Sequence, residues 1–256
     1  MKKLLLALTA VAAFTGSALA ADLPARTYTK APPPVVAPSW TGFYIFGGGG
    51  YGLWDSNTDT RTTAGGLLTV QQRTGGDGYF GTAGVGYDWQ FNHSWVAGVF
   101  ADGQFGSIRG TNEDFFSNIA GRMSDRTNAA AGVRLGYLVA PNVLSYVNGG
   151  YSYAQFSSTN LLTIGGVPAA SLPSFNRNGW FAGGGVENNL DIFGISAPGW
   201  FMKTEYRVAE YNRATLAESV GGVPNGLAVT ADPIVQTVST SLVYRFNWTG
   251  PVVAKY

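Results

Sequence analysis

The sequence contains no cysteine and a single histidine, so several kinds of site lack the residues they require. Structural zinc and haem are held by cysteine and histidine side chains, and this chain offers only His93. Disulfides are excluded as well, so stability must come from packing and hydrogen bonding. We therefore expect no cofactor and no metal site in this protein.

Charge and long apolar runs are also scarce. Charged residues make up 12% of the chain, about half the usual share of a soluble domain, and the formal net charge is +1. Such a chain gives no reason to expect nucleic-acid binding. After the amino terminus, no segment approaches the ~18 consecutive apolar residues of a transmembrane helix. Glycine, with 36 residues, and aromatic residues, at 14%, are abundant instead.

The amino terminus has the features of a secretory signal peptide. Two lysines precede the apolar run 4–14, which is too short to span a bilayer and is followed by a small-residue cleavage site at 18–20. The alternative is an N-terminal helix that remains as an anchor. Five prolines within 24–38 then predict an extended linker, or a segment that contacts a periplasmic partner. The predicted organisation is a cleaved signal peptide, a proline-rich periplasmic linker, a barrel and a periplasmic tail, at residues 1–20, 21–39, 40–248 and 249–256.

From Trp40 onward, apolar and polar residues alternate with a period of two, which is typical of strands. In one such segment Tyr79 and Trp89 fall on one face and Asp88 falls on the other. We expect strands at 42–54, 78–91, 95–106, 126–139, 143–156, 178–192, 199–211 and 235–248.

Alternation alone fits a soluble sandwich as well as a membrane barrel, and strand length and connections favour the barrel. The expected strands have 12 to 15 residues, whereas soluble sheets use about 5–6 and a membrane strand needs about 9–11 within lipid. Long connections alternate with shorter ones, as in outer-membrane barrels. The long connections are 55–77, 107–125, 157–177 and 212–234, and the shorter ones are 92–94, 140–142 and 193–198.

Large aromatic residues also gather near the ends of the expected strands. Such residues form girdles where lipid meets water, although ordinary packing is the alternative for any one of them. The residues expected near the periplasmic rim are Phe43, Trp89, Phe91, Trp95, Tyr137, Trp200, Phe246 and Trp248. Those expected toward the outer rim are Tyr51, Tyr79, Phe105, Tyr153, Trp180 and Tyr206. The sequence thus predicts an all-β, eight-stranded antiparallel up-and-down transmembrane β-barrel, with long extracellular loops, short periplasmic turns and both termini in the periplasm.

Three segments of the chain carry a resemblance to a known family. They are WTGFY at 40–44, VRLGY at 133–137 and the ending LVYRFNWTGPVVAKY at 242–256. Together with residues 18–32 they are similar to the small outer-membrane β-barrel proteins of alphaproteobacteria, the porin-like RopB-type family. The resemblance covers nearly the whole chain, least of all in the long loops. It implies an eight-stranded barrel that is abundant in the outer membrane of a Gram-negative bacterium and exposed at its surface.

Six charged residues are expected to point into the barrel. Because an unpaired buried charge is very costly, each must find a partner there. Two interpretations remain: a salt-bridged plug that locks the barrel, or a gated polar path, and the narrow bore of eight strands favours the plug. The six residues are Arg134, Glu187, Lys203, Glu205, Arg207 and Arg245.

Arginine, but not lysine, occurs in or beside the long loops. Arginine binds phosphate in a bidentate manner, and lipopolysaccharide presents phosphates at that height, so we expect some of these arginines to hold lipid phosphates. They are Arg61, Arg73, Arg109, Arg122, Arg126, Arg177 and Arg213. The alternative is solvated charge that is balanced by Asp55, Asp59, Asp77, Glu113, Asp114 and Asp125.

The carboxyl end has a pattern that barrel-assembly machinery reads in outer-membrane proteins in general. Tyr244, Phe246 and Trp248 alternate along the expected last strand, which should end near Trp248. Pro251 cannot donate to a ladder, so we expect a periplasmic tail beyond that point. The alternative is a strand that continues to Tyr256.

Two features that could indicate an enzyme do not support one. His93 lies in the shortest expected turn without an acid beside it, whereas a general base needs a nucleophile and an orienting partner. Residues 47–52 match the nucleotide-binding pattern GxGxxG, yet no helix pattern follows and no acid lies about 20 residues on. We expect Gly48, Gly50 and Gly52 to face the lumen instead, leaving room for long charged side chains.

The expected function is therefore structural. The chain should be a surface-exposed outer-membrane barrel that contributes to envelope integrity and contacts outer-membrane lipid and lipopolysaccharide, and it should not be an enzyme. The alternative is a narrow porin-like channel for the passive diffusion of small solutes. The sequence predicts neither an oligomeric state nor an extracellular partner.

Overall fold

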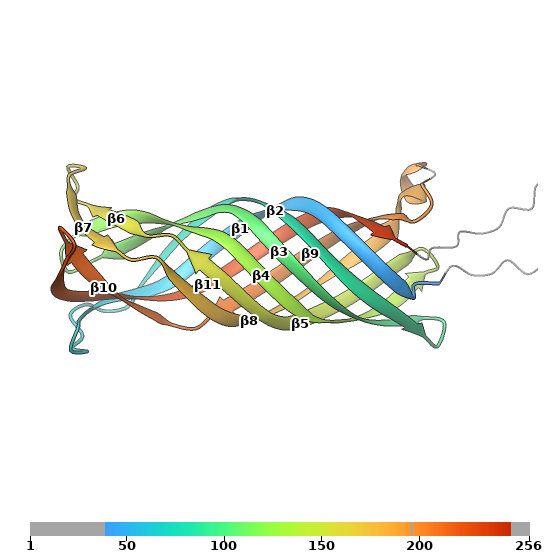
Figure 1. Ribbon diagram of the computed structural model, residues 1–256, viewed down its shortest axis with the longest axis horizontal. Coiled ribbons are helices and arrows are strands. Elements are labelled where there is room, and N and C mark those ends of the chain that lie inside the picture. The colour runs from blue at the N-terminus through green and yellow to red at the C-terminus, as the bar shows by residue number, and fades with distance from the viewer. Residues whose placement is uncertain (1–38, 196, 247–256) are drawn as a thin grey trace, which may run out of the picture. The chain divides into compact units, whose positions relative to one another are not determined.

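The computed structural model describes residues 39–195 and 197–246, which form one closed antiparallel sheet (Figure 1). Eight strands make the ring, each paired with its neighbour in sequence order, and β11 pairs with β1 to close it. They are β1 (Gly42–Thr62), β2 (Gln72–Phe91), β3 (Trp95–Asp114), β4 (Ile119–Ala140), β5 (Val143–Phe156), β8 (Phe175–Asn189), β9 (Trp200–Tyr211) and β11 (Val223–Arg245). Each of the eight overlaps one predicted strand, so the predicted fold class is confirmed.

One short helix interrupts the sheet. The 3-10 helix η1 (Leu190–Phe193) lies between β8 and β9 and ends at Gly194, whose φ of 73° favours glycine. Within the described residues, no helix combines the length and apolarity needed to cross a membrane.

The predicted faces of the strands are confirmed by exposure. The aromatic and aliphatic positions point outward, as shown by Tyr79 at 78% and Val133 at 62% exposure, whereas Asp88 and Arg134 are buried in the interior. A slip of one residue would exchange the two faces of a strand, so this agreement fixes the register of the membrane wall. The outward aromatics include nearly all of those predicted for the two girdles, while Trp248 lies outside the described residues.

The strands extend much further at the outer end than predicted. β1 continues to Thr62 and β2 starts at Gln72, so the predicted 23-residue loop is reduced to 63–71, and the β3–β4 connection is only 115–118. The prediction stopped early because these outer segments carry polar residues on their outward face, where a membrane strand carries apolar ones. Strands that emerge from lipid into water no longer need an apolar outer face.

Three further strands lie within the predicted loops. β6 (Thr159–Leu162) and β7 (Pro168–Leu172) form a hairpin, and β10 (Ala214–Val220) pairs with the first part of β11. β6 also touches β4 and β10 touches β7, so these strands continue the wall beyond the ends of β5, β8 and β9 (Figure 1). The barrel therefore has an outer extension, which we define as the part built by β6, β7, β10 and the outer halves of β1 to β4 and β11.

The glycines of β1 face the lumen as predicted, but they make room for different neighbours. A Cβ atom on Gly52 would lie 2.4 Å from Cδ1 of Ile108, and one on Gly50 would lie 2.7 Å from Cζ of Phe80. The expectation that they accommodate long charged side chains is therefore wrong at these two positions. Apolar side chains of the neighbouring strands fill the space, because this level of the lumen is packed as a core.

The predicted signal peptide, nearly all of the predicted linker and the predicted tail at 249–256 lie outside the described residues. The last described strand ends at Arg245, and Phe246 follows it in a turn.

Candidate functional site

Charged side chains from four strands meet in the lumen near the periplasmic end. Arg134 donates Nε to Oδ1 of Asp88 at 2.8 Å and lies 3.1 Å from Oε2 of Glu187 through Nη1. Arg245 places Nη2 2.8 Å from Asp88 and 2.7 Å from Glu187. Two arginines and two carboxylates thus form a closed square, and all four residues are at most 4% exposed.

A second group of charges lies further along the strands, toward the outer end. Arg207 forms two hydrogen bonds with Asp102, at 3.0 and 2.8 Å, and pairs with Glu205 at 2.8 Å. Lys203 lies 3.9 Å from the same glutamate. Tyr146 also donates to Glu205 at 2.8 Å, so this carboxylate is surrounded by donors. The group again contains two cations and two anions, so each of the two groups has no net charge.

Aromatic rings enclose both groups of charges. The guanidinium of Arg134 lies 4.4 Å from the centre of the Tyr44 ring, and that of Arg207 lies 4.4 Å from the Phe181 ring. The ammonium nitrogen of Lys203 lies 3.4 Å from the centre of Phe46. A cation over an aromatic face gains energy that grows when water is excluded, so these rings help to offset the loss of hydration.

All six predicted lumen charges therefore lie in the interior and in contact with charged partners. The prediction left out two partners, Asp88 and Asp102, which are 0% and 7% exposed. Alternation places Asp88 on the inward face of β2, and the same alternation along β3 places Asp102 there, so this was the signal that could have identified them. Their pairing depends on the curvature of the barrel, which brings β2 within reach of β4 and β11, each two strands away in the ring, and places β3 opposite β9.

Above the charges, the lumen of the outer part is packed with apolar rings. Phe156 stacks on Phe175 with ring centres 4.7 Å apart and meets the edge of Tyr211 at 5.9 Å. Trp54 lies 6.3 Å from Phe156 and is 1% exposed. This cluster resembles the core of a soluble β-sandwich more than the interior of a pore.

The seven predicted lipid-contacting arginines separate into two sets. Arg61, Arg73 and Arg213 are already paired, with Asp59 at 2.6 Å, Asp55 at 2.9 Å and Asp232 at 2.8 Å through Nε. Arg177 donates to two backbone carbonyl oxygens, those of Asn176 and Arg213. For Arg109, Arg122 and Arg126, no carboxylate partner is found within the described residues.

The unpaired arginines occupy neighbouring strands on the outer surface. Arg109 of β3 lies opposite Ser124 of β4, and Arg122 and Arg126 flank that serine on the same face of β4. Arg109 and Arg122 line one pocket of about 320 Å³, which Asp77 also borders. Asp77 accepts a hydrogen bond from the Tyr51 hydroxyl. The sequence also allowed these arginines to be balanced by nearby acids. That holds for Asp55 and Asp59, whereas Asp114 and Asp125 are buried in the interior and balance none of the seven arginines.

A buried carboxyl pair in the outer extension was not predicted. Glu218 of β10 is 1% exposed, and burial, together with the nearby Asp114, raises its pKa to about 7. Asp114 accepts hydrogen bonds from the Thr60 hydroxyl at 2.6 Å and from the backbone N–H of Phe116 at 2.9 Å. The sequence signal was weak, because Glu218 belongs to a segment that had been taken for a loop.

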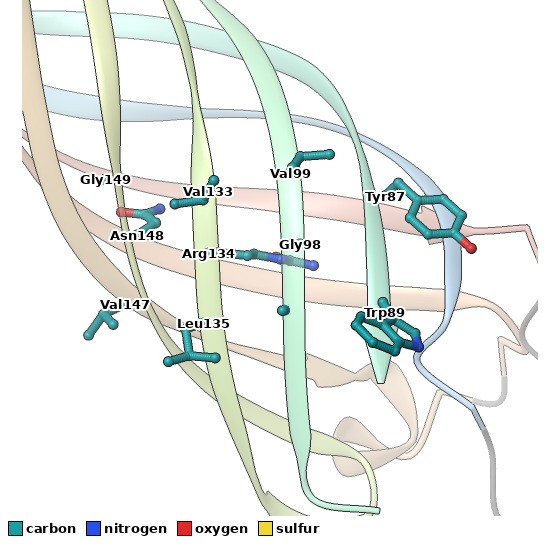
Figure 2. A pocket seen from close by; sticks show the side chains of 11 residues that line it. Tyr87, Trp89, Gly98, Val99, Val133, Arg134, Leu135, Val147, Asn148 and Gly149 are labelled. Carbon is teal, nitrogen blue, oxygen red and sulfur yellow. The ribbon is translucent and has the colours of Figure 1, made fainter. Parts of the chain in front are cut away.

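The membrane-facing wall is apolar and slightly hollowed. A groove of about 650 Å³ runs over β2 to β5, with Tyr87 and Trp89 on one side and Leu135 and Val147 on the other (Figure 2). Arg134 is the neighbour of Leu135 in β4, but its side chain points into the barrel. The groove thus belongs to the surface that meets lipid hydrocarbon, as an apolar outer band requires.

The described residues offer little material for catalysis. His93 lies in the β2–β3 turn at a φ of 58°, and its carbonyl oxygen accepts a hydrogen bond from Gln90. Among the described residues, no group of three or more His, Cys, Asp or Glu side chains is arranged to hold a metal ion.

Comparison with known proteins agrees with this architecture. Residues 17–197 match the family described as the autotransporter beta-domain. The 31 kDa outer-membrane immunogenic proteins of Brucella melitensis biotype 1 and Brucella suis biovar 1 are each 29% identical over 262 residues, which covers 96% of this chain and all of theirs.

Among solved structures, OprG from Pseudomonas aeruginosa is 12% identical, with a TM-score of 0.48, over 80% of this chain and 97% of its own. Neisserial surface protein A is 14% identical, with a TM-score of 0.40, over 80% of this chain and 98% of its own. The chain belongs to the autotransporter beta-domain family, and it is a small, surface-exposed β-barrel protein of the Gram-negative outer membrane.

Proposed function

We propose that this protein is a closed, structural barrel that stabilises the outer membrane and holds lipopolysaccharide phosphates against its wall. The observation that carries the proposal is the filled lumen. The inward-pointing cations Arg134, Lys203, Arg207 and Arg245 each lie within 4 Å of a carboxylate, and all of them are less than 7% exposed. Their side chains occupy the space that a solute would need.

A solute path would have to break contacts in both parts of the lumen. Removing one partner of a buried ion pair costs about 3–5 kcal/mol, and the periplasmic square contains several such pairs. Further out, the stacked rings of Phe156 and Phe175 are buried in the interior. A solute would have to pass both the ion-paired part and the aromatic part of the lumen, which supports a sealed barrel rather than a channel.

The contact with lipopolysaccharide rests on the two arginines of the outer pocket. Two guanidinium groups in one pocket match a phosphate, because each can donate two parallel hydrogen bonds. Arg109 lies four residues beyond Phe105 of the outer girdle, or about 13 Å along the strand. This spacing supports a position for both arginines just above the hydrocarbon, at the level of lipid headgroups.

Conductance separates the sealed barrel from the narrow channel. The refolded protein in a planar bilayer should show no reproducible steps at moderate voltage. Glu187→Ala, which breaks the square, provides a comparison in which leakage is expected if the square contributes to closure. Steady, ion-selective conductance of the unmodified protein would establish the channel instead.

Lipid retention tests the arginine pocket independently of closure. Replacing Arg109 and Arg122 with lysine keeps the charge and removes bidentate geometry, and it should lower co-purified lipopolysaccharide about tenfold, equivalent to ~1.4 kcal/mol. The matched control replaces the paired Arg73 and Arg213 with lysine and should change little. Equal retention in all three proteins would contradict the phosphate contact.

The last strand supplies the contact proposed with the barrel-assembly machinery. Leu242 and Phe246 are 50% and 56% exposed on the outward face, with Tyr244 between them. We propose that this aromatic face, continued by Trp248, is the insertion signal and that 249–256 is a dispensable tail. Deleting 249–256 should leave insertion unchanged, whereas Phe246→Ala should reduce it.

No enzymatic activity is part of the proposal. The single histidine lies in a turn, and the carboxylates Asp88, Glu187, Asp102 and Glu205 of the lumen are paired with cations. A hydrolytic assay with peptide and ester substrates should therefore give no turnover.

A further inference from the structure

The outermost turns of the barrel are apolar and carry no charge. Three connections reach the same end of the outer extension: β1–β2, β6–β7 and β10–β11 (Figure 1). Each holds two adjacent glycines flanked by aliphatic residues, as Ala64-Gly-Gly-Leu67, Ile164-Gly-Gly-Val167 and Val220-Gly-Gly-Val223. No charged residue occurs in 62–72, 159–174 or 219–231, although arginines line the wall below.

The aliphatic side chains of these turns are unusually exposed for a surface in water. Ile164 is 88% exposed, Val70 is 74%, Val223 is 68% and Val167 is 61%. The fourth connection, β3–β4, adds Phe116 at 58%. Exposed apolar groups that gather at one end of a protein mark an interaction surface.

The backbone of two turns is satisfied internally and in the same way. In the β6–β7 turn, the N–H of Thr163 donates to the Val167 carbonyl at 2.9 Å, and the Thr163 hydroxyl accepts from the Val167 N–H at 3.2 Å. In the β1–β2 turn, the N–H of Thr62 donates to the Gly66 carbonyl at 2.7 Å, and its hydroxyl accepts from the Gly66 N–H at 2.9 Å. Each threonine thus closes its own turn without needing water.

We propose that these uncharged glycine turns dock into an apposed lipid bilayer, one that faces the outer surface of the cell. Hydrocarbon excludes charge and penalises unsatisfied backbone groups, and the three turns carry no charge while two of them bond part of their own backbone. Separate protruding turns suit a fluid partner, which can surround each one, better than a folded protein, which must match all of them at once. The inference does not depend on the proposed arginine pocket, because the turns lie beyond it and share no residue with it.

Vesicle flotation tests this docking. The protein, held in nanodiscs, is mixed with neutral phosphatidylcholine vesicles and centrifuged through a density step. The unmodified protein should float with the vesicles. A variant with Ile164→Asp, Val167→Asp, Val220→Asp and Val223→Asp should float at least tenfold less, while its barrel remains folded by heat-modifiable migration.

A matched variant controls for added charge. Asn160→Asp, Ser174→Asp, Asn176→Asp and Asn212→Asp place four acids on exposed positions of β6, near the start of β8 and just before β10, and should float like the unmodified protein. Failure of the unmodified protein to float would overturn the proposal, and so would equal flotation of the turn variant. Loss of self-association in the turn variant, without any flotation of the unmodified protein, would identify a second copy of the chain as the occupant and reject the bilayer.

Discussion

The two ends of the barrel interior are filled by different kinds of side chain. Toward the periplasm, the lumen holds four cations and four anions in two neutral groups. In the outer extension it holds stacked aromatic rings around Trp54 and Phe156. Both regions are filled with side chains, but one depends on ion pairs that must be complete and the other on a core that resembles that of a soluble protein.

The environment of the wall explains this difference. Where lipid surrounds the barrel, the outward face is apolar and the polar residues of each alternating strand are directed inward. Where water surrounds it, the outward face can be polar and the inward face apolar, as in a sandwich. Arg134 and Trp54 are both inward residues, and their difference follows from what lies on the other side of the wall.

The largest effect is expected from breaking the periplasmic square. Glu187→Ala leaves Arg134 and Arg245 with only Asp88 between them, and it should lower the free energy of unfolding by about 3–5 kcal/mol. Urea unfolding in lipid vesicles measures the loss. Glu210→Ala, at an exposed position of β9, is the control and should change little. Similar values for both variants would show that the square does not stabilise the barrel.

A somewhat smaller and more local effect is expected from the aromatic end. Trp54→Ala should cost about 3 kcal/mol and should loosen the outer extension while the membrane-embedded strands stay folded. Limited proteolysis of the protein in vesicles should then release outer segments. Trp180→Ala, at a position 53% exposed toward lipid, serves as the control. Global unfolding of the Trp54 variant would contradict the division into two regions.

The stability of the outer extension should depend on pH through Glu218. Glu218 has a pKa of about 7 in the folded chain against an ordinary value of 4.5, so the folded state keeps a proton that the unfolded chain releases. The free energy of unfolding of the outer extension should therefore fall by about 1 kcal/mol, after allowing for solvent screening, as the pH rises from about 4.5 to 7. Above about pH 7 it should stay constant. Hydrogen exchange of β10 measures this change. Glu218→Gln should remove the pH dependence, and an unchanged profile would exclude Glu218 as its source.

The smallest effect is expected at the exposed pair of Arg73 and Asp55, which lies on the outer surface. Arg73 is 69% exposed by its side chain, so Asp55→Asn should cost no more than ~0.5 kcal/mol and nothing measurable in 0.5 M salt. Thermal unfolding at low and high salt checks this. A loss comparable with that of Glu187→Ala would mean that surface charge matters as much as lumen charge.

The parts of the fold that follow from alternation were predicted from the sequence. A period of two assigns each residue to a face wherever lipid demands an apolar exterior, which is why Tyr79, Asp88 and Arg134 were placed as found. The outer parts of the strands were missed because water removes that demand, and outward-facing polar residues such as Asn57 then resemble a loop. The three strands within the predicted loops were missed for the same reason.

The candidate site was predicted in part. The inward direction of Arg207 and Glu205 follows from their strand, but the pairing of Arg207 with Asp102 joins β9 to β3, and no local pattern carries that information. Likewise, seven arginines were expected as candidates for lipid contact, and only the folded chain shows that Arg73 is paired whereas Arg109 and Arg122 share a pocket.

The sequence by itself therefore determined that the chain is exported, that it forms eight membrane strands and which side of each strand is polar. These properties depend on near neighbours and on the two environments that lipid and water provide. The tertiary structure decided how the lumen charges pair, which arginines lack a carboxylate partner among the described residues and where the glycine turns converge. Those properties depend on distances between residues far apart in the sequence, such as Asp102 and Arg207 or Asp88 and Arg245, and only the closure of the sheet sets such distances.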